Sequence, residues 1–163
     1  MGLQLPGELV TLLQDLGYNW PEADEEKLFD LGEVWMGFSG QLDPAAQRAN
    51  AAAAQVWNRN QGDAINAFRA KWSADDSPGR SLADSVTGAE MVGPLLMVAA
   101  GVVLALKINV IVQLVTLAIE IAEALATAVP TFGASLLEIP VFKEITNRLV
   151  NLLISLATEA ILG

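Results

Sequence analysis

The stretch "VWNRNQGDAINAFRAKW", from Val56 to Trp72, decides the fold of this chain. Helix-favouring residues run up to Trp57, polar and turn-prone residues follow, and a second amphipathic segment begins at Asp63. Asparagine tolerates the left-handed backbone region and Gly62 enters it without steric cost, so we expect a tight turn here. Two amphipathic helices joined by so short a loop become antiparallel neighbours.

The second segment places Ile65, Phe68 and Trp72 on one helical face, because they are three and four residues apart. Trp57 and Trp72 then stand on either side of the bend. We expect Trp57 to close the end of the hairpin and Trp72 to anchor the second helix, both as core residues. The predicted hairpin motif therefore consists of Trp57, Gly62, Phe68 and Trp72.

The segment before the turn predicts one long helix. Asp24 is a suitable N-cap, and Glu25 and Glu26 follow it in the first turn. Apolar or small residues then recur in alternating steps of three and four, which is the seam of a coiled-coil-like helix. The large residues of the seam are the candidates for facing a partner, and small ones continue it: Leu28, Leu31, Trp35, Phe38 and Leu42, then Ala45, Ala49, Ala52 and Val56.

Composition excludes several classes of function. The formal net charge of −10 argues against nucleic acid as a partner, because phosphate binding needs clustered lysine and arginine. The chain has no cysteine and no histidine, which removes disulfides, thiol nucleophiles, Ser-His triads and almost every zinc site. We therefore expect no enzyme activity, no cofactor and no metal.

The two halves of the chain differ in charge. Residues 1–90 hold 14 of the 19 acidic residues, whereas residues 91–163 hold 5 acidic and 3 basic residues. The first half is typical of a solvated helical bundle, and the second must be covered by protein or by lipid. We expect a hairpin domain with an N-terminal capping segment over residues 1–80 and an apolar helical extension over residues 81–163.

The apolar extension contains a borderline transmembrane signal. A helix is expected from Leu82, disturbed at Gly88 and at Gly93-Pro94. Sixteen residues, 91–106, have no polar side chain, which falls short of the roughly twenty that span a bilayer. After the end of this helix at Pro130 we expect a turn, and Pro140 opens a last helix that folds back.

Polar residues form a narrow stripe on this helix. They are spaced four, three, four and three apart: Asn109, Gln113, Thr116, Glu120 and Glu123. In one interpretation the stripe faces water, and the opposite face is buried in a bundle. In the other, several such helices assemble in a membrane and the stripe lines a polar path. The residues expected to be buried in the first case are Ile111, Leu114, Ala118, Ile121 and Leu125.

The opening "MGLQLPGELVTLLQDLG" does not have the pattern of a secretory signal. It contains Glu8 and Asp15, has no basic first region, and carries a proline at position 6. If the protein is exported, we expect export without a cleaved leader.

Residues 24–76 resemble the W-x-G helical hairpins, small substrates of the type VII (ESX) secretion system. They share a tryptophan that closes a long helix, a glycine-containing turn, and Lys-Trp fifteen residues after the first tryptophan. Nearly the whole chain resembles the N-terminal module of large actinobacterial polymorphic toxins, the group named for a mycobacterial channel-forming necrotizing toxin. The segments that carry this second resemblance are "LPGEL", "GYNWPEADEEKL", "VWNRNQGDAINAF" and "ALKINVIVQLVTLAIEIAEALATAV".

The chain departs from the hairpin family at two motifs. Arg59 stands two residues after the tryptophan, where the family has glycine, and Gly62 serves the bend instead. A literal W-x-G at 35–37 lies in the middle of a predicted helix, so we assign it no role. The Y-x-x-x-E pattern from Tyr18 to Glu22 precedes the first long helix, whereas the family's export signal follows the second, so a partner would have to supply the signal.

The resemblance implies an all-α fold, an antiparallel helical hairpin of the W-x-G type extended by a hydrophobic C-terminal helical segment. It implies a non-enzymatic module for type VII secretion, exported to the medium or the cell surface. Its partners would be a small W-x-G protein or a second copy in a homo-oligomer, together with the secretion machinery. The alternative is a membrane-active, pore- or channel-forming helical protein in which the hairpin is a soluble cap.

Overall fold

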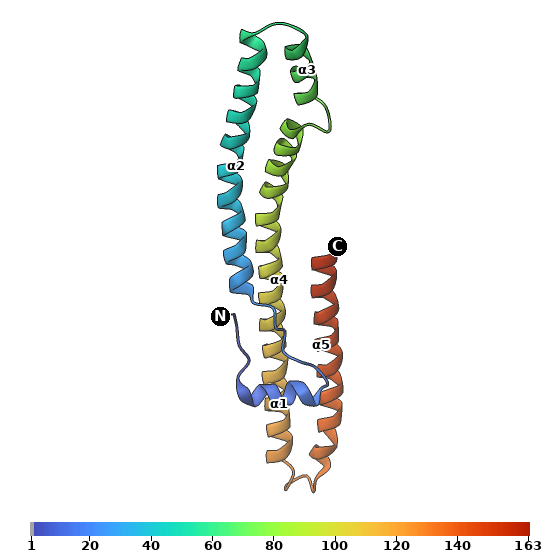
Figure 1. The fold of residues 1–163 in the computed structure, drawn as a ribbon. Coiled ribbons are helices and arrows are strands. Elements are labelled where there is room, and N and C mark those ends of the chain that lie inside the picture. Colours follow the sequence, from blue (N-terminus) through green and yellow to red (C-terminus); the bar gives the residue numbers. More distant parts are fainter. Residues whose placement is uncertain (1) are drawn as a thin grey trace. The chain divides into compact units, whose positions relative to one another are not determined.

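A computed structural model describes residues 2–163, and those residues form helices and no β-strand. This confirms the predicted all-α class. The elements are shown in Figure 1: α1 (Gly7–Asp15), α2 (Glu25–Arg59), α3 (Asp63–Trp72), α4 (Pro78–Ala126), the 3-10 helix η1 (Ala134–Glu138) and α5 (Ile139–Leu162).

The chain divides into two compact units. One comprises residues 2–27 and Ala99–Gly163, and the other comprises Leu28–Val98. The long helix α4 supplies residues to both units, because it continues without a break from Pro78 to Ala126. The sequence-based division into residues 1–80 and 81–163 stays a prediction.

The turn between α2 and α3 lies where the sequence places it. Helix α2 ends at Arg59, α3 begins at Asp63, and Gly62 precedes α3 with φ +120°. A positive φ is costly for residues with a Cβ, and Gly62 occupies the position of this turn that has one. The side-chain amide of Asn60 donates to the Val56 carbonyl at 2.8 Å, which satisfies a free carbonyl at the helix end.

In the unit Leu28–Val98, α2 and the first part of α4 lie side by side (Figure 1). Their backbones approach closely at two glycines. A Cβ on Gly93 would lie 3.0 Å from the Gly32 carbonyl oxygen, and a Cβ on Gly32 would lie 3.0 Å from that of Gly93. Only glycine permits this approach.

The sequence predicts a disturbance at Gly88 and at Gly93-Pro94, and α4 continues as a helix through both places. A proline inside a helix removes one hydrogen bond and bends the helix, but it need not end it when the surrounding turns are held by packing. Here Gly93 is buried against α2, whereas Pro94 points away and is exposed.

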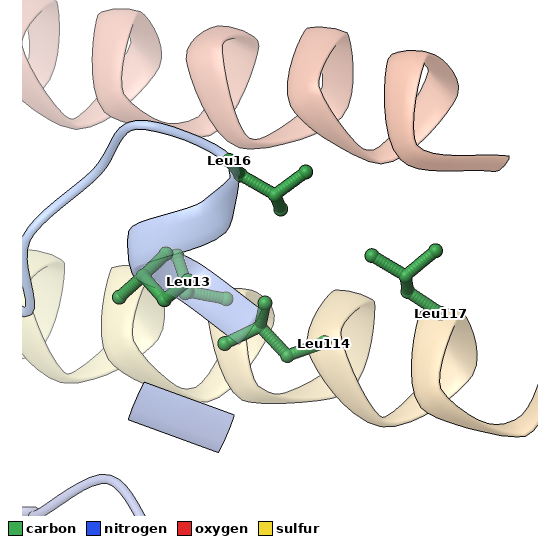
Figure 2. Close-up of a cluster of buried hydrophobic side chains, with 5 residues drawn as sticks. Leu13, Leu16, Leu114 and Leu117 are labelled. Atoms are coloured by element: carbon green, nitrogen blue, oxygen red, sulfur yellow. The ribbon is translucent and has the colours of Figure 1, made fainter. Parts of the chain in front are cut away.

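In the unit of residues 2–27 and Ala99–Gly163, α1 covers the middle of α4. Leu13 of α1 and Leu16, which directly follows α1, join Val110, Leu114 and Leu117 of α4 in one buried cluster, four of whose residues are labelled in Figure 2. The sequence predicted only a capping segment at the N-terminal end of residues 1–80, and α1 within it was not predicted.

Helix α5 folds back in this unit, as expected from the sequence. The Tyr18 hydroxyl donates to the Asn147 side-chain oxygen at 3.0 Å, and the Asn147 amide donates to the Leu16 carbonyl at 3.1 Å. Tyr18 therefore has a structural role in holding the N-terminal segment against α5. Helix α4 ends at Ala126, four residues before the predicted end at Pro130, and α5 begins at Ile139, next to the predicted Pro140.

Candidate partner-binding surface

The inward face of α2 differs in register from the predicted seam. The partly or fully buried positions follow steps of three and four: Leu28, Gly32, Trp35, Ser39, Leu42, Ala46, Ala49, Ala53 and Val56. Five residues of the predicted seam are on this face: Leu28, Trp35, Leu42, Ala49 and Val56. At the four seam positions between them, the inward residue is the next one along the chain, for example Gly32 instead of Leu31. The reason is that the close approach to α4 occurs at Gly32 rather than at the larger Leu31.

This shift leaves large apolar side chains of α2 at the surface. Leu31 is 45%, Val34 65% and Phe38 48% exposed. Trp35 is half-buried beside them, and its ring meets that of Phe38 edge to face, with the centroids 5.8 Å apart. Val34, Trp35 and Phe38 line a shallow pocket of about 370 Å³. We call Leu31, Val34, Trp35 and Phe38 the α2 surface.

The sequence-predicted partner candidates therefore separate into two groups. Leu31, Trp35 and Phe38 contribute to the α2 surface, whereas Leu28 and Leu42 turn toward the inside of the unit and are half-buried. Asp30 and Glu33 are exposed on the same turns of α2, so the surroundings of the surface are acidic.

The hairpin motif forms an aromatic row. The ring of Phe68 lies 5.9 Å from that of Trp57 and 6.0 Å from that of Trp72, centroid to centroid. Both tryptophans are half-buried rather than fully buried, because α3 is short and has no fully buried residue. The guanidinium of Arg69 lies over the Trp57 ring, with its carbon 5.9 Å from the centroid.

Two residues that the sequence analysis did not single out hold Trp72 in place. The Trp72 indole N–H donates to the Asn50 side-chain oxygen at 3.0 Å, which ties α3 to α2. A Cβ on Gly79 would lie 2.8 Å from the same indole nitrogen, so the ring rests against the backbone at the start of α4. Trp72 therefore contacts α2 through one hydrogen bond and the start of α4 through one glycine; its predicted role as the anchor of the second helix stays a prediction.

A buried ion pair lies in the other unit. The Lys107 ammonium donates to the Glu25 carboxylate at 2.7 Å and to the Ala23 carbonyl at 2.6 Å, and Lys107 is 1% exposed. The Leu3 backbone N–H donates to the second carboxylate oxygen of Glu25. The ammonium also lies 5.8 Å from the centroid of the Trp20 ring. In the sequence, Lys107 directly follows the sixteen residues, 91–106, that have no polar side chain, and no local pattern links it to Glu25.

Burial alone would raise the pKa of Glu25, because it penalises the charged carboxylate. The hydrogen bonds from Lys107 and from the Leu3 N–H, together with the charge of Lys107, outweigh that effect and hold the pKa of Glu25 below its ordinary value. The pair is therefore charged at neutral pH and joins the start of α2 to α4.

The polar stripe of α4 is only partly solvent-facing. Asn109, Thr116 and Glu123 are exposed, whereas Gln113 and Glu120 are half-buried. On the opposite face Leu114 is fully buried, and Ile111, Ala118 and Ile121 are half-buried. The expected burial of Leu125 is wrong, since it is 57% exposed. Its position near the end of α4 lies beyond the turns that contact Leu13 and Leu16 of α1.

No group of three or more acidic residues that could hold a metal ion is found within residues 2–163. Two stretches of helix are long and apolar enough, by length and composition, to cross a membrane: Pro78–Ala126 and Ala134–Leu162.

Comparison with known proteins gives one match. The family model described as the WXG100 like domain matches residues 4–149, which include α1 to α4 and the first turns of α5. No curated protein and no solved structure matches the chain.

Proposed function

The chain belongs to the WXG100-like family, whose members are helical proteins associated with type VII secretion, and we propose that it is a secretion module that pairs with a small W-x-G partner through the α2 surface. Domains of this family commonly pair with a partner or with themselves, and they are typically not enzymes. The proposal names the surface and the kind of partner.

The observation that carries the proposal is the exposed line of Leu31, Val34 and Phe38 on α2. Apolar anchors three and four residues apart on a helix are what helix-in-groove recognition uses, and aromatic residues dominate the energy of such contacts. The half-buried Trp35 supports Phe38 from the side. Because Asp30 and Glu33 are exposed beside the surface, the contacting helix of the partner should carry lysine or arginine at its rim.

We further propose that the module belongs to a secreted toxin-type protein of actinobacteria. Two features support this. The family match extends from residue 4 to residue 149, well beyond the hairpin of residues 24–76. The segments "LPGEL" and "GYNWPEADEEKL", which carry the toxin resemblance, contribute α1 and the start of α2. Export to the medium or the cell surface would then depend on the type VII machinery and need no cleaved leader.

The partner surface is tested by the affinity of the chain for a small W-x-G protein. Phe38→Asp places a charge in the centre of the α2 surface and should weaken binding by about tenfold or more, equivalent to about 1.4 kcal/mol. Gly40→Asp is the matched control. It adds the same charge two residues further along α2, at an exposed position where a Cβ meets nothing within 4 Å, and it should leave the affinity unchanged.

Equal affinities for both variants and the unaltered chain would place the contact elsewhere. If the unaltered chain binds no such protein but sediments as a dimer that Phe38→Asp dissociates, the occupant of the surface is a second copy. The proposed surface would be refuted if a helical partner bound Gly40→Asp weakly but bound Phe38→Asp as tightly as the unaltered chain.

A second candidate function is a membrane-active, pore- or channel-forming helical protein. The observation in its favour is that the two apolar helices are little covered, with 22% and 11% of their apolar windows buried. A core helix of a soluble protein would be mostly buried. In this case the polar stripe would line a path through an assembly of several copies.

Single cysteines at Gln113 and Leu114, reacted with a water-soluble maleimide, separate the two functions without background, because the chain has no native cysteine. A secretion module in plain buffer should label faster at 113, which is half-buried, than at 114, which is fully buried. Labelling at 113 only after transfer from liposomes to detergent would support the membrane path.

A further inference from the structure

The connection between α4 and α5 displays large apolar side chains that no part of the chain covers. Val129 is 86%, Phe132 100% and Leu137 77% exposed. Between Glu123 and Glu138 there is no charged residue. We call residues 124–137 the α4–α5 tip. Isolated exposed apolar residues are ordinary, but three of this size in one charge-free turn mark an interaction site.

The conformation of Phe132 strengthens this observation. Its φ is +54°, in the left-handed region that Gly, Asn and Asp enter most easily, and it is the one non-glycine residue with positive φ among residues 2–163. The next residue, Gly133, is also left-handed. If position 132 had only to adopt this backbone conformation, asparagine or glycine would adopt it with less strain. Phenylalanine relieves no strain there, and its side chain is fully exposed, so neither the turn nor the packing among residues 2–163 accounts for it.

The side-chain hydroxyls of the tip donate hydrogen bonds within the chain. The three polar side chains of the tip each donate to a main-chain carbonyl: Thr127 to Glu123 at 2.8 Å, Thr131 to Thr127 at 2.7 Å, and Ser135 to Ala124 at 2.7 Å. The Gly133 backbone N–H donates to the Ala128 carbonyl at 2.7 Å. Moving such a turn into a less polar medium breaks few hydrogen bonds with water, because these donors have partners within the chain.

We propose that the α4–α5 tip inserts into the interface of a phospholipid bilayer with zwitterionic head groups. A protein groove would ordinarily offer hydrogen-bonding partners, about one for every 100–200 Å² of contact. The side-chain hydroxyl donors of the tip are already used within the chain, so they do not meet such partners. A lipid interface needs only apolar side chains and an internally satisfied backbone.

The charged residues around the tip determine which lipid head groups it can approach and how deeply it can insert. The chain carries a net charge of −10, and Glu123 and Glu138 bracket the tip, so an anionic surface would repel it. The same two carboxylates stop the insertion at the head-group level, since a charged side chain is costly deeper in the bilayer. The proposal requires neither a channel nor the α2 surface, and either can fail independently of it.

An environment-sensitive fluorophore (NBD) on a single cysteine tests the proposal. The probe is placed at Ala134, which is exposed in the tip, and separately at Ser155, which is exposed on α5. With phosphatidylcholine vesicles the probe at 134 should shift to shorter wavelength and be quenched by spin labels attached to the lipid. The probe at 155 should change little. Replacing part of the phosphatidylcholine by phosphatidylserine at low salt should weaken the response.

A second pair of variants isolates Phe132. In the 134-labelled chain, Phe132→Asp should reduce partitioning into phosphatidylcholine vesicles by about tenfold or more, because a charge replaces the most exposed apolar group. Asn151→Asp adds the same charge at an exposed position of α5 and should leave partitioning unchanged. Far-UV circular dichroism confirms that both variants keep their helices.

Three outcomes would overturn the proposal. No lipid response at 134 would show that the tip stays in water. Equal responses at 134 and 155 would show that the helices rather than the tip enter the bilayer. A concentration-dependent shift at 134 without lipid would show that a second copy covers the tip.

Discussion

The two compact units of this chain hold their helices together in different ways. In Leu28–Val98, α2 and α4 meet through residues that have almost no side chain, with Gly32 and Gly93 backbone to backbone. In residues 2–27 with Ala99–Gly163, leucines of α1 and α4 fill the interior and a buried Glu25–Lys107 pair joins two elements. The glycine contact forms because Gly32 and Gly93 have no side chain. The other unit is held by packed leucines and by a pair of opposite charges.

This difference predicts which kind of substitution each unit tolerates. A glycine contact should fail when a single carbon is added, whereas a leucine core with an ion pair should fail when an atom or a charge is removed.

Lys107→Met removes the charge and leaves the Glu25 carboxylate buried without its partner. Breaking one side of a buried pair should lower the free energy of unfolding by about 3–5 kcal/mol. Chemical denaturation of the variant measures this.

The double variant Glu25→Gln with Lys107→Met is the control for that experiment. It should recover a large part of the loss, because replacing both charges of a buried pair is often neutral. A loss below about 1 kcal/mol in the single variant would show that water reaches the pair and that it is not buried in solution.

Acid should weaken the same unit. Because the pKa of Glu25 in the folded chain is below its ordinary value of 4.5, the pair stabilises the fold above that pH. The contribution is lost as the pH falls from about 4.5 through the lower folded value, where the carboxylate is protonated. Denaturation at several pH values should show a steeper fall for the unaltered chain than for Glu25→Gln; parallel curves would contradict the depressed pKa.

The glycine contact gives a paired prediction on one helix. Gly93→Ala should be less stable than Gly88→Ala by about 1–3 kcal/mol, since only the first new Cβ meets the Gly32 carbonyl, at 3.0 Å. At Gly88 a Cβ meets nothing within 4 Å, so alanine there should stabilise by about 0.5–1 kcal/mol through helix propensity. If both variants are equally stable, the helices do not approach as closely as described.

The hairpin motif gives the smallest expected effect. Trp72→Phe keeps most of the ring contact with Phe68 but loses the hydrogen bond to Asn50. The bond is exposed, so we expect a loss of about 0.5–1.5 kcal/mol. In a chain that already carries Asn50→Ala, Trp72→Phe should lower the free energy of unfolding by a smaller amount, because the hydrogen-bond acceptor is already absent. An identical cost in both backgrounds would mean that the bond does not form in solution.

The sequence predicted the turn because its chemistry is local. Asn60 and Gly62 suffice to place the bend between α2 and α3. The heptad positions Leu28, Trp35 and Leu42 were also predicted to lie on one face, and the structure places them on the inward face of α2. These parts of the fold follow from spacing alone.

The rest depends on contacts between distant residues, which spacing does not reveal. Glycine at position 32 counts for little in a hydrophobic pattern, yet it sets the register of α2 and thereby leaves Leu31 and Phe38 exposed. Glu25 and Lys107 lie 82 positions apart, and no local motif links them. The α2 surface is therefore visible only once α4 is in place.

The most direct test of the proposed pairing is a photo-crosslinking experiment on α2. A benzoylphenylalanine replaces Phe38 in one chain and Gly40 in another, and each is illuminated with the small W-x-G partner. We predict a crosslink to the partner from position 38 and none from position 40, because Phe38 belongs to the α2 surface and Gly40 does not. A crosslink from position 40 without one from position 38 would contradict the account.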